Sequence, residues 1–207
     1  MKTFSLVMLM TLFSTLVSAH NIPEADLAKI KAGEVLQEVN WKEGLVWPEV
    51  KMLALIDHTP YENICVFYDF ETHKNYLPDM KESNIVEKFS PTKVRVHFVM
   101  DMPWPVKKTE HTNDNELKKE NDSYILSWKL VKAEQMSDTY GFIQFIPFEG
   151  KSIMRYSNQI VPNSSLAGMF KGRVAKDVDV SIKAIMKHLN KEITSNKQHY
   201  LSKCPKL

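Results

Sequence analysis

The sequence predicts one α+β domain in which a curved antiparallel sheet wraps around a long C-terminal helix. Residues 93–161 contain successive strand-like runs joined by short turn signals, which is the pattern of an antiparallel meander. Apolar and polar residues alternate within these runs, so each strand has one covered face and one wet face. Residues 165–193 then repeat apolar side chains at steps of three and four, which is typical of an amphipathic helix.

The 207 residues are enough for one domain with its own core. The formal net charge is +2 and the basic residues are scattered, so we expect no nucleic-acid partner. The sequence contains no nucleophile elbow, no His-Glu-x-x-His, no phosphate loop and no Cys-x-x-Cys. We therefore expect a monomer without catalytic residues, cofactor or metal.

Residues 1–19 have the features of a secretory signal peptide. Lys2 provides a positive start, residues 4–17 are mostly apolar, and Val17-Ser18-Ala19 offers small residues for cleavage. The apolar run is shorter than the ~20 residues that span a bilayer, although an uncleaved anchor is the alternative. We expect a domain at 20–194 in the periplasm or outside the cell. Residues 195–207 form a polar tail whose composition is typical of a disordered end.

The two cysteines allow two interpretations. An exported protein meets an oxidising compartment, where Cys65 and Cys204 can form a disulfide. Alternatively, Cys65 is a free buried thiol, because it belongs to the apolar run at residues 64–67. Both interpretations remain open.

The elements expected before the meander are a helix at 23–32, strands at 34–40 and 46–57, and two short helical segments between 59 and 76. Pro23 suits the first helical turn and Gly33 can end it. Thr59 and Pro60 have the residue types of an N-cap and a first helical position.

Six further strands are expected at 83–89, 93–100, 107–117, 123–133, 138–147 and 151–161. Two inward faces are clear: Val94, Val96, Phe98 and Met100, and Tyr124, Leu126, Trp128 and Leu130. Arg95 and His97 then face solvent, unless the register is shifted by one residue. The strand at 138–147 is apolar on both faces, so both faces can be covered.

Local motifs accompany this order of elements. They are Ala-Leu-Ile-Asp-His-Thr-Pro at 54–60, Tyr-Leu-Pro-Asp-Met at 76–80, and Met-Pro-Trp-Pro-Val at 102–106. Together they resemble the helix-grip fold of the START lipid-transfer family, within the SRPBCC superfamily, over residues 33–189. The resemblance is to an exported, bacterial-type member and implies a cavity for one lipid, sterol or other apolar molecule. The Arg-Asp pair that commonly follows the START loop is Lys-Lys-Thr-Glu at 107–110 here, so no role of that arginine is transferred.

Inward apolar side chains either line a hollow or fill a solid core, and the resemblance favours the hollow. The expected cavity residues are Val96, Phe98, Met100, Tyr124, Leu126, Trp128, Phe145, Met154, Tyr156, Val174, Val178 and Ile182. The expected gate consists of Met102, Trp104, Gly168 and Gly172. Trp104 would cap the mouth, contact a membrane interface or fold back on the core. Its replacement by alanine is expected to slow transfer more than it lowers stability.

These features predict a carrier for a lipid or other hydrophobic small molecule, with transient membrane contact. A sixteen-carbon chain in water costs roughly 12 kcal/mol, at about 0.8 kcal/mol per methylene. The alternatives are a cyclase- or hydrolase-type enzyme and a non-transporting sensor. The enzyme would need several of Asp57, His97, Glu110 and Tyr156 close together. Asp69, Glu71 and His73 do not share a helical face, so a solvated turn is expected there and not a metal site.

Overall fold

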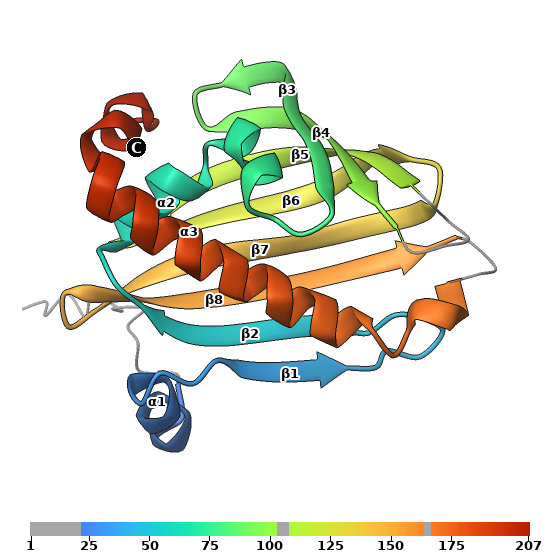
Figure 1. Ribbon diagram of the computed structural model, residues 1–207, viewed down its shortest axis with the longest axis horizontal. Helices are drawn as coiled ribbons and strands as arrows, with labels where there is room; N and C mark the ends of the chain where they lie inside the picture. The colour runs from blue at the N-terminus through green and yellow to red at the C-terminus, as the bar shows by residue number, and fades with distance from the viewer. Residues whose placement is uncertain (1–21, 103–107, 164–166) are drawn as a thin grey trace, which may run out of the picture.

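The computed structural model describes residues 22–102, 108–163 and 167–207, and it contains one eight-stranded sheet (Figure 1). The strands are β1 (Leu36–Asn40), β2 (Glu49–Ile56), β3 (Met80–Ser90), β4 (Lys93–Asp101), β5 (Lys108–Glu120), β6 (Ser123–Ala133), β7 (Met136–Phe148) and β8 (Lys151–Pro162). Their order across the sheet is β1-β2-β8-β7-β6-β5-β4-β3, and every neighbouring pair is antiparallel. The predicted α+β helix-grip architecture is confirmed.

The helices are α1 (Glu24–Lys31), α2 (Pro60–Phe67) and α3 (Val174–Lys203), with short 3₁₀ segments η2 (Phe70–Asn75) and η3 (Ala167–Phe170). Helix α3 lies diagonally across one face of the sheet (Figure 1). Thr59 is the predicted N-cap of α2, and it forms a capping box with Glu62.

The expectation of a disordered tail after residue 194 is wrong. Helix α3 continues to Lys203, with a kink at Asn196, where φ is −133° and ψ is 20°. Among the contacts that hold these last turns, Tyr200 is 7 % exposed in the core, and Cys204 forms a disulfide with Cys65. The polar composition misled the prediction because a few tertiary contacts, including one aromatic side chain and one covalent bond, anchor the segment.

The start of the last helix also differs from the prediction. Residues 167–170 form the 3₁₀ segment η3, and regular helix begins only at Val174. Gly172 lies in the turn between them. Since glycine is a poor helix former, an interruption at this point is physically reasonable.

The two faces of the sheet follow the predicted alternation. Arg95 lies on the outer face, where its guanidinium is 2.7 Å from Asp114 Oδ1 and 3.0 Å from Glu87 Oε2. His97 lies beside it, with Nδ1 3.3 Å from Thr112 Oγ1. Helix α1 covers part of this outer face through Ile30, which packs with Ile146 of β7 and Ile153 of β8. The strand that is apolar on both faces is therefore covered on both.

The concave face of the sheet has two distinct ends. At the closed end, α2 and the C-terminal turns of α3 cover the strands (Figure 1), and Ile64, Phe145, Met154 and Leu189 are almost completely buried there. At the open end, η3 and the first turns of α3 lie over the strands. The open end contains the cavity described next.

Candidate ligand cavity

A cavity of about 580 Å³ lies between the concave face and the first half of α3. This volume is within the range of small-molecule sites in proteins. The sheet contributes Phe98, Met100, Leu126, Trp128, Tyr156 and Ile160 to its wall, and α3 contributes Val174, Val178, Ile182 and Ile185. Phe67 and Phe70 close it on the side of α2 and η2. The wall is thus largely apolar, as a hydrophobic guest would require.

The indole ring of Trp128 packs against a glycine, Gly141, on the neighbouring strand. A Cβ atom at Gly141 would lie 2.6 Å from Trp128 Cζ2 and would collide with the backbone oxygen of Ser157. The absence of a side chain at Gly141 therefore makes room for the indole ring, whose Nε1 donates to Asn158 Oδ1 at 3.1 Å. Trp128 and Asn158 form one side of the cavity wall.

The inward face of β5 is polar. Thr109, His111, Asn113 and Asn115 all line the cavity, at every second position of the strand. In the register with β4, Asn113 lies opposite Val96 and His111 lies opposite Phe98. These short side chains occupy positions where large apolar ones would fill the space, so they help to leave it open. These residues could not be predicted from the alternation of apolar and polar residues, because both faces of β5 carry polar side chains at these positions.

The polar groups inside the cavity are uncharged. The ring of His111 stacks on Phe98 with 5.1 Å between centroids. Burial, with a smaller contribution from nearby His97, lowers the pKa of His111 to about 4, so the ring is neutral at pH 7. Burial likewise raises the pKa of the Tyr156 hydroxyl, which remains protonated.

Charge is confined to the rim. Five charged residues line the cavity, and all are exposed: Asp79, Asp101, Arg173, Lys176 and Asp177. They come from the start of β3, the end of β4 and the beginning of α3. The cavity therefore reaches solvent at this edge of the open end.

His73 corrects the expectation of a solvated turn. Its ring is 3 % exposed, packs near Phe67 and Phe70, and has Nε2 2.8 Å from the Phe67 carbonyl oxygen. Burial lowers its pKa to about 4. Within the described ranges, no three His, Cys, Asp or Glu side chains gather as metal ligands would.

The structure places most of the sequence-predicted lining residues at this cavity: Phe98, Met100, Leu126, Trp128, Tyr156, Val174, Val178 and Ile182. Val96, Phe145 and Met154 point the same way but lie in the packed core, and Tyr124 packs on Tyr61 of α2 with 5.5 Å between ring centroids. Helix α2 packs against β6 and β7 at the closed end, and none of these four residues belongs to the cavity wall. Trp47 lines the cavity too, and sequence analysis did not identify it.

The predicted gate residues lie in different environments. Met102 is half-buried and lines the cavity, whereas Gly168 and Gly172 are exposed near the start of α3. Trp104 lies outside the described residues. Of the acid–base groups considered for an enzyme, only Tyr156 faces the cavity. Asp57 pairs with Lys151 at the surface, and Glu110 pairs with Lys108 on the outer face beside His97.

No protein-family model and no curated protein matches the chain by sequence. Solved structures do match. The STAR-related lipid transfer protein of Xanthomonas axonopodis has a TM-score of 0.68 at 15 % identity, over 75 % of this chain and 93 % of that one. Human STARD10 has a TM-score of 0.60 at 15 % identity, over 78 % and 73 %.

An aromatase/cyclase from Streptomyces, Zhui, has a TM-score of 0.61 at 11 % identity, over 71 % of this chain and 96 % of that one. At such identities the similarity shows the fold alone. Among the helices that the structure describes, none combines the length and apolarity needed to cross a membrane. The similarity to these solved structures shows that the chain has the helix-grip fold of the START and SRPBCC proteins.

Proposed function

We propose that this protein binds a lipid or another hydrophobic small molecule in the cavity and carries it, as a monomer, between membranes. The main support is the largely apolar cavity of about 580 Å³ between the sheet and α3, which reaches solvent at the open end. Burying a sixteen-carbon chain there would offset roughly 12 kcal/mol of exposure to water. The fold shared with a STAR-related lipid transfer protein is consistent with this role.

Exchange of the ligand requires an opening, and we place it at the start of α3. Trp47 Nε1 donates to the Ala167 carbonyl oxygen at 2.8 Å, and Gln37 Nε2 donates to the Ala175 carbonyl oxygen at 2.7 Å. These bonds hold η3 and the first turn of α3 on the β1–β2 side of the sheet. Gly168 lies within η3 and Gly172 lies in the turn after it, so the segment can swing away once the bonds break, with Met102 on the opposite side of the mouth.

The site of action that we propose is the periplasm or the extracellular space, after cleavage near Ala19. The signal-peptide features of residues 1–19 support it, and so does the Cys65–Cys204 disulfide, because such bonds persist in oxidising compartments. N-terminal sequencing of the exported protein should begin at His20, whereas retention of the first residues would contradict export with cleavage.

Native mass spectrometry of the exported protein tests the carrier proposal. We expect one hydrophobic molecule per protein, released by organic extraction and transferable to acceptor vesicles. Val178→Trp should fill the cavity and abolish this occupancy, whereas Lys187→Trp, on the exposed side of α3, should leave it unchanged. Empty protein that takes up neither 1-hexadecanol nor another hydrophobic probe would contradict the proposal.

A second candidate is a cyclase-type enzyme that uses the same cavity. It is favoured by the similarity of fold to an aromatase/cyclase and by titratable groups at the wall, among them His111 and Tyr156. The two candidates differ in what happens to the bound molecule. A carrier releases the molecule chemically unchanged, whereas an enzyme releases a different compound.

A further inference from the structure

The polar face of β5 lies inside a largely apolar cavity. Asn113 is 5 % exposed and Asn115 is 3 % exposed, yet both belong to the cavity wall together with His111. Asn115 Nδ2 donates to the Asn113 carbonyl oxygen at 3.1 Å, which fixes one amide against the strand. The side chains that lie two residues apart thus form a short ladder that faces the hollow.

Two atoms of this ladder have no hydrogen-bond partner in the part of the chain that the structure describes. They are Asn113 Oδ1 and His111 Nδ1. A buried polar atom without a partner costs about 1–3 kcal/mol, so such atoms usually have a function or a missing partner. Both atoms are buried, but they belong to residues of the cavity wall, so a bound molecule can supply that partner once the side chain turns towards it.

The backbone next to Asn113 is irregular as well. The pairing of β5 with β6 shifts between Thr112 and Asn113, since Thr112 is opposite Lys132 and Asn113 is opposite Leu130. Val131 is therefore an extra residue on β6. Bulges of this kind often lie beside binding sites, where they change the direction of a side chain.

The charge distribution restricts the chemistry of the ligand. The charged side chains of the wall are exposed at the rim, and the groups around Asn113 are neutral amides, hydroxyls and a neutral imidazole. An ionised head group placed at β5 would lose its hydration without gaining an opposite charge, which is costly. An uncharged polar group would lose far less.

We propose that the ligand is an uncharged amphiphile with a hydroxyl group, and that this hydroxyl donates to Asn113 Oδ1 in the interior of the cavity. His111 Nδ1, at the neighbouring inward position of β5, is available for a second contact. The apolar body of the ligand then lies against Trp128, Val178 and Ile182. This inference rests on the proposed function and adds the class of molecule to it.

Three probes with the same hydrocarbon chain test the inference: 1-hexadecanol, 1-methoxyhexadecane and hexadecanoate. The methyl ether keeps the oxygen but cannot donate, and the carboxylate is charged. In titrations of delipidated full-length protein at pH 7, we expect the ether to bind about tenfold more weakly than the alcohol. Hexadecanoate should bind more weakly still.

Variants of β5 show whether Asn113 causes this difference. Asn113→Leu should reduce the preference for the alcohol to about twofold or less, and His111→Phe, which keeps the stack on Phe98, should reduce it partly. Thr112→Val lies on the outer face of the same strand and should leave the preference unchanged. Because Asn113 Oδ1 has no partner without ligand, Asn113→Leu should not lower the Tm of the empty protein.

The outcomes separate this inference from the proposed function. If the alcohol and the ether bind equally well, or if hexadecanoate binds best, the hydroxyl assignment is wrong and the carrier stands. If Asn113→Leu keeps the full preference, or loses it only together with several degrees of Tm, Asn113 is a structural residue and the assignment is wrong. If no probe binds, the proposed function itself fails.

Discussion

At the closed end of the concave face, α2 and the last turns of α3 fill the space above the strands, whereas at the open end the first turns of α3 stand over a cavity. The strands β4, β6 and β8 run through both ends, so the difference does not come from the sheet itself. It comes from what covers each end and from β5, whose inward residues change from Leu117 at the closed end to Asn113 and His111 at the open end.

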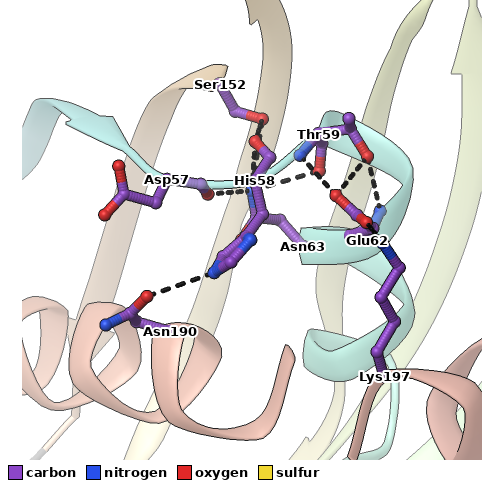
Figure 2. Close-up of polar contacts among 8 residues, drawn as sticks. All are labelled: Asp57, His58, Thr59, Glu62, Asn63, Ser152, Asn190 and Lys197. Carbon is purple, nitrogen blue, oxygen red and sulfur yellow. Dashed lines mark hydrogen bonds and ion pairs between the residues drawn. The ribbon is translucent and has the colours of Figure 1, made fainter. Parts of the chain in front are cut away.

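Long-range connections reinforce the closed end. Lys197 on α3 pairs with Glu62 on α2, and His58 Nε2 donates to Asn190 Oδ1 of α3 at 3.1 Å (Figure 2). His58 has a φ of +71°, an uncommon conformation for a residue other than glycine. Ser152 Oγ donates to the His58 carbonyl oxygen at 2.8 Å and holds this corner (Figure 2).

The open end has weaker attachments to α3, namely the hydrogen bonds of Trp47 and Gln37 to backbone carbonyl groups. We infer that the closed end contributes most to stability, and we propose that the open end admits the ligand. Substitutions at the closed end should lower the free energy of unfolding, and substitutions at the open end should alter binding or transfer.

The largest loss of stability is expected from Cys65→Ala/Cys204→Ala. The disulfide joins residues 139 positions apart, and in the chain-entropy model closing so long a loop contributes about 4–5 kcal/mol. Urea unfolding of the double variant should show a loss of that order. Wild type under a reducing agent should match it. A loss below about 1 kcal/mol would show that α2 and α3 hold the closed end without the covalent link.

A matched pair of methionines compares the two ends directly. Met154 is fully buried at the closed end, and Met154→Ala should cost about 2–5 kcal/mol because it leaves a cavity in packed core. Met100 lines the existing cavity, so Met100→Ala should cost less than about 1 kcal/mol. Chemical unfolding of the empty proteins measures both. Equal losses would contradict the division into closed and open ends.

The difference between the two ends also separates what could be predicted from the sequence from what could not. Alternation correctly placed Val96, Phe98 and Trp128 on the inward face, because one covered face imposes a period of two. It could not separate Val96 and Met154 in solid core from Phe98 at the cavity, since that depends on where α2 packs. His111 and Asn113 were missed because a polar inward face carries no hydrophobic signal, and the anchoring of Tyr200 depends on tertiary contacts.

Acid should weaken the closed end through Glu62. Burial alone would raise the pKa of Glu62, but hydrogen bonds from Lys197 and Thr59 outweigh it and lower the pKa from 4.5 to about 2. The Glu62 side chain is 12 % exposed, and this difference corresponds to about 3 kcal/mol. Because the folded pKa is the lower one, the contribution is complete above pH 4.5 and is lost as the pH falls towards 2.

Unfolding free energies measured between pH 6 and pH 2.5 test this contribution. Glu62→Gln should be less stable than wild type at pH 6 and should approach it at pH 2.5, because most of the contribution of the ionised carboxylate to stability is lost by then. Glu24→Gln, in the exposed first turn of α1, should follow the wild-type curve. Parallel curves for wild type and Glu62→Gln would mean that Glu62 does not link α2 to α3 through its charge.

The smallest effect on stability, and a clear effect on transfer, is expected at the glycines of the open end. An added Cβ atom at Gly168 or Gly172 would meet no atom of the described residues within 4 Å, so Gly168→Ala/Gly172→Ala should fold normally. Alanine restricts the backbone within η3 and in the turn after it, which should slow the movement of this segment. Transfer of a fluorescent sixteen-carbon alcohol between vesicles should therefore be several-fold slower, with equilibrium binding and Tm almost unchanged.

Gly44→Ala, in the β1–β2 loop, controls for a general effect of removing a glycine, although its φ of +76° should lower the Tm slightly. Unchanged transfer rates in the double variant would show that the ligand enters by another route, because a hinge at η3 cannot be insensitive to both of its glycines.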